Sequence, residues 1–186
     1  MAVLFTISKK GGNNGKFWNG AHPEKFFPFI HKEGVHTIWD VRRSPNGQSG
    51  CFFDTDIMKF CCGHEKIKFE WRLDLAPQKE VFKKCNAENW DLLTYAKAYF
   101  TPSVIEALNK VQSADELDGV AVLCAETELF NCHRLLIAEY YKAKFAELKL
   151  KHLGLAYDRY GNEKGAVPQV VMYNTRLYIR QLPGQN

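Results

Sequence analysis

The residues best suited to chemistry lie together in one short segment, residues 124–134, which reads CAETELFNCHR. A cysteine thiolate is a nucleophile and a neighbouring imidazole can take its proton, so Cys124 is the candidate nucleophile and His133 its general base. Glu126 could orient that imidazole or act as an acid–base group itself. The alternative is that Cys124 is a packed cysteine at the end of a strand. The segment therefore predicts a catalytic site formed by Cys124, Glu126 and His133.

The end of this segment is also expected to begin a helix that binds an anion. Asn131 is a good N-cap residue, which places Cys132, His133 and Arg134 in the first helical turn. Free N–H groups and the helix dipole favour anions there, and an arginine at that end is unfavourable unless an anion is bound. Cys132 and Arg134 are therefore predicted to contribute to an anion-binding site. The alternative is that Arg134 only fixes the loop by pairing with an acidic side chain: Glu126, Glu128 or Asp40.

A second polar block lies in HTIWDVRRSP, residues 36–45. It places Asp40, Arg42 and Arg43 at or just beyond the end of a strand-like run. Open parallel sheets bind ligands at the carboxyl ends of their strands, so these three residues are predicted to bind the ligand in the same cleft as Cys124. Asp40 could instead accept hydrogen bonds from loop N–H groups.

A metal site is the less favoured interpretation of the same residues. Cys124, Cys132 and His133 could combine with Cys61, Cys62 or His64 of the CCGH segment. The chain has no CxxC pair, and the usual zinc-ligand spacing is missing, so we predict no metal and no cofactor. Without a metal, three cysteines are expected to be small buried apolar residues: Cys51, Cys62 and Cys85.

The elements that must position these residues alternate between strands and helices. This order predicts an α/β domain with a small, mostly parallel central sheet flanked by helices. Strands are expected at residues 3–7, 36–41, 67–73, 119–124 and 148–153, and helices at 23–34, 87–100, 101–111 and from about 131 to 145. Pro28 is expected to kink or split the first helix. Two short β-rich runs around Asn174 and Thr175 predict a hairpin-like extension at the end of the chain.

Length and composition fit one ordinary globular domain. The chain has 186 residues, of which 46% are hydrophobic and 25% charged, and its net charge is +4. No apolar run approaches the ~20 residues that span a bilayer, and the first residues do not resemble a signal peptide. We therefore expect a cytoplasmic protein with reduced thiols and no membrane partner. The domain is expected to cover residues 1–153, with residues 154–186 as an extension packed on it.

Several motifs resemble one protein family, the domain of unknown function 488 family of the YeaO-like superfamily. DVRRSP matches its Asp-Val-Arg-Arg-x-Pro block, and CAETELFNCHR followed by a helix matches its Cys-x-Glu…Cys-His-Arg signature. VLFTI resembles the opening strand, KLKHL the closing strand, and LDLAPQKEVF the Leu-Ala-Pro segment of the YeaO-like branch. Lys9 and Lys10 stand where the family usually has His-Ser. The resemblance runs from residue 3 to about residue 153.

The resemblance implies a small α/β domain whose shared polar residues surround one cleft, but it implies no activity. The matched positions are Asp40, Arg42, Cys124, Glu126, Cys132, His133 and Arg134. From the residues themselves we expect an intracellular enzyme that acts on an anionic substrate, phosphate-bearing or nucleotide-like. The alternative is a non-catalytic nucleotide or nucleic-acid binding module that uses the basic segment at residues 8–16 and stacks bases on Phe17 and Trp18. A third possibility is that the polar cluster is only structural.

Overall fold

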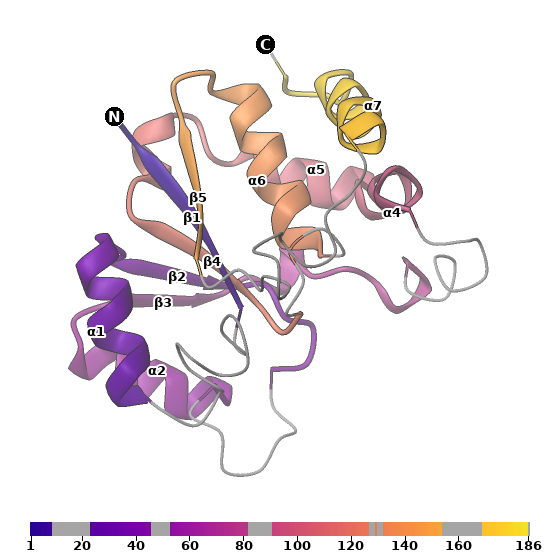
Figure 1. Ribbon diagram of the computed structural model, residues 1–186. Helices are drawn as coiled ribbons and strands as arrows, with labels where there is room; N and C mark the ends of the chain where they lie inside the picture. The colour runs from indigo at the N-terminus through magenta and orange to yellow at the C-terminus, as the bar shows by residue number, and fades with distance from the viewer. Residues whose placement is uncertain are drawn as a thin grey trace, which may run out of the picture.

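A five-stranded parallel sheet forms the centre of the computed structural model (Figure 1). The structure describes residues 1–8, 23–45, 53–81, 91–126, 129, 132–153 and 169–185. The strand order is β3-β2-β4-β1-β5, and each neighbouring pair runs parallel. The strands are β1 (Val3–Ser8), β2 (Thr37–Asp40), β3 (Lys68–Trp71), β4 (Val120–Cys124) and β5 (Lys149–Leu153). The predicted α/β class with a parallel sheet is confirmed.

The middle of the sheet is formed by the most apolar segments of the chain. β4 is buried along its whole length between β1 and β2, as expected for a strand covered on both faces. Its register pairs Cys124 with Ser8 of β1 and Leu123 with Asp40 of β2. The last residues of three adjacent strands, Ser8, Asp40 and Cys124, therefore lie at the same edge of the sheet.

Helices cover both faces of this sheet (Figure 1). The helices are α1 (Pro23–Glu33), α2 (Thr55–His64), α4 (Leu92–Tyr99), α5 (Pro102–Asn109), α6 (His133–Lys144) and α7 (Gln169–Arg180). On one face, α1 and α2 pack against side chains such as Ile38 and Leu123. On the other face, the remaining helices pack against side chains such as Trp39, Val122 and Cys124. Alternate residues of one strand thus enter different cores.

Most predicted helices are confirmed. α5 begins as expected, with Thr101 accepting a hydrogen bond from the backbone N–H of Val104 and Pro102 in the first turn. α1 is one continuous helix with Pro28 inside it, so Pro28 does not split the helix. α2, which contains Cys61, Cys62 and His64, is a helix that the sequence pattern did not predict. None of the described helices has a stretch long and apolar enough to cross a membrane.

The predicted hairpin near the end of the chain is wrong. Residues 169–180 form the helix α7, which packs against α4 and α6. Thr175 and Ile179 are buried there, and Thr175 Oγ1 donates a hydrogen bond to the carbonyl of Val171. The β-branched residues of this segment favour a strand in isolation, but their helical spacing allows one face to bury apolar surface against two other helices. Tertiary packing therefore overrides local propensity.

The edge strand β3 is less regular than its alternating sequence predicts. Ile67 is buried and Phe69 is partly buried, as expected for one face of a half-exposed strand. The alternation of apolar and polar residues in IKFEWRL, residues 67–73, predicts Trp71 and Leu73 on that same face, but each is 45% exposed. Trp71 instead donates a hydrogen bond from its indole Nε1 to the carbonyl of Arg42, 2.9 Å away. The strand prediction holds, while the burial prediction fails at its carboxyl end.

Candidate functional site

Two thiols and an imidazole form a buried cluster at the carboxyl end of β4. Cys124 is the last residue of that strand, Cys132 is the N-cap residue of α6, and His133 is the first helical residue. The Nδ1 atom of His133 lies 3.8 Å from the Sγ atom of Cys124 and 3.8 Å from that of Cys132. The chain thus leaves the sheet at Cys124 and enters α6 at Cys132.

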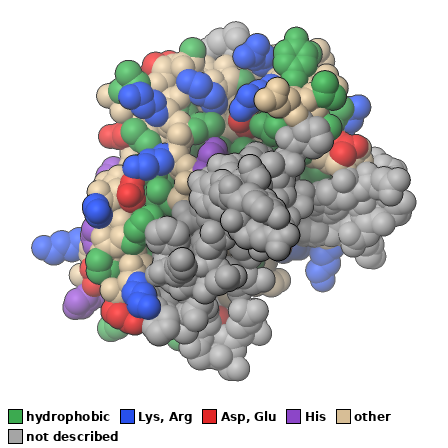
Figure 2. All heavy atoms as spheres, viewed as in Figure 1, with side chains coloured by type: hydrophobic (Ala, Val, Ile, Leu, Met, Phe, Trp, Pro, Cys, Tyr) green, Lys and Arg blue, Asp and Glu red, His purple; other side chains and the backbone are tan. Residues whose placement is uncertain are grey.

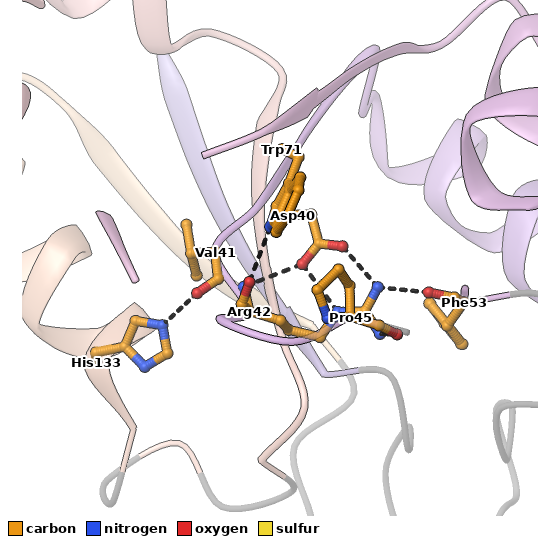
Figure 3. Close-up of polar contacts among 7 residues, drawn as sticks. All are labelled: Asp40, Val41, Arg42, Pro45, Phe53, Trp71 and His133. Carbon is orange, nitrogen blue, oxygen red and sulfur yellow. Dashed lines mark hydrogen bonds and ion pairs between the residues drawn. The ribbon is translucent and has the colours of Figure 1, made fainter. Parts of the chain in front are cut away.

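The position of His133 is fixed by the neighbouring strand. Its Nε2 atom lies 3.0 Å from the carbonyl oxygen of Val41, just beyond β2 (Figure 3). A carbonyl can only accept, so Nε2 carries a proton, and in the neutral imidazole Nδ1 is then free to accept from a thiol. The ring also packs against Tyr99, with centroids 5.7 Å apart. The bare nitrogen of this imidazole therefore faces both cysteines.

The two thiols are electrostatically different. A hydrogen bond from the Cys132 thiol lowers the pKa of Cys124 well below the ordinary value despite burial, with further lowering from His133 and Arg134. Burial raises the pKa of Cys132 well above the ordinary value, and the neighbouring Cys124 raises it further. The arrangement therefore favours a thiolate at Cys124 and a thiol at Cys132.

Cys124 is nevertheless less accessible than we expected. We expected it at the mouth of a cleft, but it is only 4% exposed, and Cys132, His133 and Arg134 are buried too. The side chain of Cys124 points to the face of the sheet that α6 covers, so it belongs to the core between the sheet and that helix. The expected exposed position of Cys124 is therefore wrong.

Arg134 fixes the segment that follows β4. Its Nη1 atom donates a 2.6 Å hydrogen bond to the backbone carbonyl of Glu126. This corresponds to the loop-fixing alternative, with a backbone oxygen in place of the expected carboxylate. The guanidinium also lies close enough to lower the pKa of Cys124. Arg134 thus supplies positive charge to the thiol cluster while it positions the backbone beside it.

Glu126 does not take the orienting role that we predicted. Its side chain is exposed, and the group that orients His133 is the carbonyl of Val41. Glu128 and Asn131 lie outside the described residues. The structure begins α6 at His133, with Cys132 as its N-cap residue, whereas we predicted the cap at Asn131. Cys132 makes no side-chain capping hydrogen bond, which leaves its sulfur directed to the cluster.

Asp40 and Arg42 form a separate, buried ion pair (Figure 3). Arg42 donates from Nε and Nη2 to the two carboxylate oxygens at 2.8 and 2.6 Å, and from its Nη atoms to the carbonyls of Pro45 and Phe53. These bonds occupy four of the five N–H groups of a guanidinium. Asp40 also accepts from the backbone N–H of Arg42, as the loop-acceptor alternative requires. The pair closes the loop after β2.

The two predicted blocks therefore share a sheet edge but not a cleft. Phe53, which accepts from Arg42, belongs to the core under α1 and α2, whereas Cys124 and Cys132 belong to the core under α6. The expectation that Arg42 lines one cleft with Cys124 is wrong, because strand pleating sends these side chains to opposite faces. The Val41 carbonyl, between Asp40 and Arg42 in the chain, is what reaches the thiol cluster. Sequence reasoning missed it because a backbone oxygen has no sequence signature.

The other predicted positions lie away from the cluster. Arg43 donates to the carbonyl of Pro77 and to Oε1 of Gln78. Cys61, Cys62 and His64 lie on α2, which covers the opposite face of the sheet, so they do not complete a metal site with Cys124. Cys62 is buried as expected, and burial raises its pKa to about 12. Cys51 and Cys85 lie outside the described residues, as do Lys9, Lys10, Phe17 and Trp18.

One comparison with known proteins identifies the family. Residues 22–141, which include β2, β4 and most of α6, match the family described as "Domain of unknown function DUF488". No curated protein and no solved structure matches the chain. The match covers more than half of the 186 residues and includes both polar blocks. The chain belongs to the domain of unknown function 488 family.

Proposed function

We propose that the protein is an enzyme in which Cys124 attacks a small anionic substrate, phosphate-bearing or nucleotide-like, and His133 acts as the general base. The observation that carries the proposal is the contact of 3.8 Å between Cys124 Sγ and His133 Nδ1, together with the bond from Nε2 to Val41. A nucleophile, a base and a group that orients the base are the three parts that thiol catalysis requires. Here Cys124 lies at the end of β4, His133 lies at the start of α6, and Val41 directly follows β2.

The charge around the cluster supports an anionic substrate. Arg134 lies near Cys124, and the free N–H groups of the first turn of α6 begin beside it. In a buried site these positive groups act over short distances with little screening. Glu126 remains a candidate acid–base group, because its backbone is held beside the cluster by Arg134 while its side chain is exposed.

The test compares two alkylating reagents of similar size and different charge. Metal-free protein is treated at pH 6 to 7 with iodoacetate or with iodoacetamide, and the labelled peptides are mapped. We expect Cys124 to react faster than Cys61, whose pKa is raised by burial and by Glu65, and we expect Cys124 to prefer the anionic reagent. His133→Gln should slow labelling of Cys124, and His64→Gln is the matched control. If Cys124 labels only after denaturation, the nucleophile proposal is wrong.

A second candidate function, non-catalytic binding of a nucleotide or nucleic acid, is supported by a basic pocket elsewhere. A pocket of about 900 Å³ lies between α6, β5 and α7, and its lining includes Lys142, Lys149, Arg176 and Arg180, together with Glu139, which pairs with Arg176. Figure 2 shows several Lys and Arg side chains over the part of the molecule where these elements lie in Figure 1. Clustered cations attract phosphates, with a strong salt dependence. Fluorescence titration with a labelled oligonucleotide at two salt concentrations, repeated with Arg180→Glu, tests this candidate.

A further inference from the structure

The two thiols and the imidazole also have the geometry of a metal site. We propose that Cys124, Cys132 and His133 bind one Zn²⁺ ion and that the bound ion makes Cys124 unreactive. The three side chains are buried, and their ligand atoms all lie within 4.8 Å of one another. Metal binding is an inference independent of the proposed function, whereas the loss of reactivity rests on Cys124 being the nucleophile.

The two sulfur–nitrogen distances are close to those of tetrahedral zinc. With Zn–S of about 2.3 Å and Zn–N of about 2.0 Å, a tetrahedral angle separates sulfur from nitrogen by about 3.5 Å. The observed separation between Nδ1 of His133 and each sulfur is 3.8 Å. Both sulfur–nitrogen separations therefore fit a tetrahedral ion to within a few tenths of an ångström, and the two sulfur atoms lie within 4.8 Å of each other.

The imidazole is already oriented as a ligand. A metal-binding histidine usually donates its other ring N–H to a carbonyl or carboxylate, which fixes its tautomer and its direction. Here Nε2 donates to Val41, and the N–H of Val41 donates in turn to the carbonyl of Leu123 at 3.0 Å. The carbonyl that orients His133 is thus itself held by strand pairing, and Nδ1 remains available to the ion.

Charge and burial select the kind of ion. Two thiolates in a buried cluster are costly unless a cation balances them, and one divalent ion with two thiolates and a neutral imidazole is neutral overall. Thiolate and imidazole ligands suit Zn²⁺, whereas Mg²⁺ and Ca²⁺ require oxygen ligands. Any proton still carried by the thiols of Cys124 and Cys132 would be released to solvent on binding. Three protein ligands leave the fourth coordination position to water or another donor.

The spacing of these three ligands in the chain differs from the usual zinc-ligand spacings, so the sequence pattern did not predict a metal site. Cys132 and His133 are adjacent, and adjacent ligands do not form a recognised spacing. Cys132 has an extended backbone, with φ −134° and ψ 139°, while His133 begins the helix. This change of backbone conformation at the helix start turns both side chains towards Cys124.

Cobalt provides a direct test that does not depend on activity. The full chain is reduced, stripped with a chelator and titrated with Co²⁺. We expect one equivalent to produce a thiolate-to-cobalt charge-transfer band and the visible bands of a tetrahedral site, and Zn²⁺ to abolish both. Cys132→Ser and His133→Ala should lose these bands. Cys61→Ser and His64→Gln are matched controls from the other cysteine- and histidine-containing segment, and they should keep them.

X-ray absorption on zinc-loaded wild-type protein keeps the test valid if a variant does not fold. It should show two sulfur ligands at about 2.3 Å and one nitrogen ligand at about 2.0 Å. Absence of these shells, or cobalt bands that persist in Cys132→Ser or vanish in the controls, would overturn the metal site. Labelling of Cys124 with iodoacetamide should then be at least tenfold slower with Zn²⁺ than without it. If cobalt binds but metal-free Cys124 is unreactive, the metal site stands and the proposed nucleophile does not.

Discussion

His133 and Val41 are joined by a hydrogen bond of 3.0 Å that links the start of α6 to the end of β2. The bond connects two segments that are 92 residues apart in the chain. It fixes the proton of the imidazole on Nε2, so Nδ1 faces the thiols of Cys124 and Cys132. The catalytic role and the metal site that we propose for the cluster both require this contact.

His133→Gln should separate the structural role of this residue from its chemical role. The glutamine amide can still donate to the carbonyl of Val41, but it offers no basic nitrogen to Cys124. We expect a fall of about tenfold or more in the rate of alkylation of Cys124 at pH 7, with the melting temperature nearly unchanged. A variant that keeps the wild-type rate would show that His133 does not act as the base.

Loss of Arg42 should destabilise the fold strongly. The side chains of Asp40 and Arg42 are 0% and 4% exposed, so Arg42→Ala leaves an uncompensated buried carboxylate. Such a loss typically costs about 3–5 kcal/mol in the free energy of unfolding, which urea denaturation would measure. Lys68→Ala removes a more exposed pair with Glu70 and should cost about 1 kcal/mol or less. Equal effects in both variants would contradict the structural role assigned to Arg42.

Protonation of His152 should reduce stability in mild acid. Burial lowers the pKa of His152 to about 4, while Glu139 raises it and Arg134 and Arg176 lower it. The unfolded chain, with a pKa of about 6.5, therefore binds more protons between pH 6.5 and 4, and the free energy of unfolding should fall by about 2–3 kcal/mol across this range. In His152→Gln the same acid series should be flatter. Parallel curves for the two proteins would argue against this pKa shift.

The contribution of α7 can be measured at one buried position. Ile179→Ala removes a fully buried side chain between α7 and the helices beneath it, and it should cost about 2–5 kcal/mol. Val170→Ala, at an exposed position of the same helix, should change stability by less than about 0.5 kcal/mol. The comparison by thermal or urea unfolding also tests the helix itself. A hairpin would not give residues 170 and 179 this difference.

An anion bound beside Arg134 should stabilise the protein. Phosphate or a nucleotide at 100 times its Kd would add about 2.7 kcal/mol to the free energy of unfolding, which is visible as a rise in melting temperature. Arg134→Gln should abolish the rise if the anion binds at α6, whereas Arg180→Gln should abolish it if the basic pocket binds the anion. No shift in the wild-type protein with phosphate, nucleotides or polyanions would contradict both sites.

The sequence by itself determined the fold class and the place of the cluster of Cys124, Cys132 and His133 at the carboxyl end of a strand. The continuous apolar run of residues 119–124 predicted a strand covered on both faces, and the residues that follow it predicted a polar strand end and the start of a helix. Both predictions are local, because burial on two faces requires an apolar run and the start of a helix requires particular residue types. The prediction of a shared sheet edge for Asp40 and Cys124 needed only parallel strands.

Only the tertiary structure decided which of these residues meet. Arg42 and Arg134 carry the same group, yet Arg42 bonds to Asp40 and to the carbonyl of Phe53, whose side chain belongs to the core under α1 and α2, whereas Arg134 lies beside Cys124. Strand pleat and register set the faces of Asp40 and Cys124, and the start of α6 at His133 sets the position of Arg134. Tertiary contacts also made residues 169–180 a helix in spite of their β-branched residues. The partner of His133 is a backbone oxygen brought across 92 residues by strand pairing, and no side-chain pattern in the sequence encodes that contact.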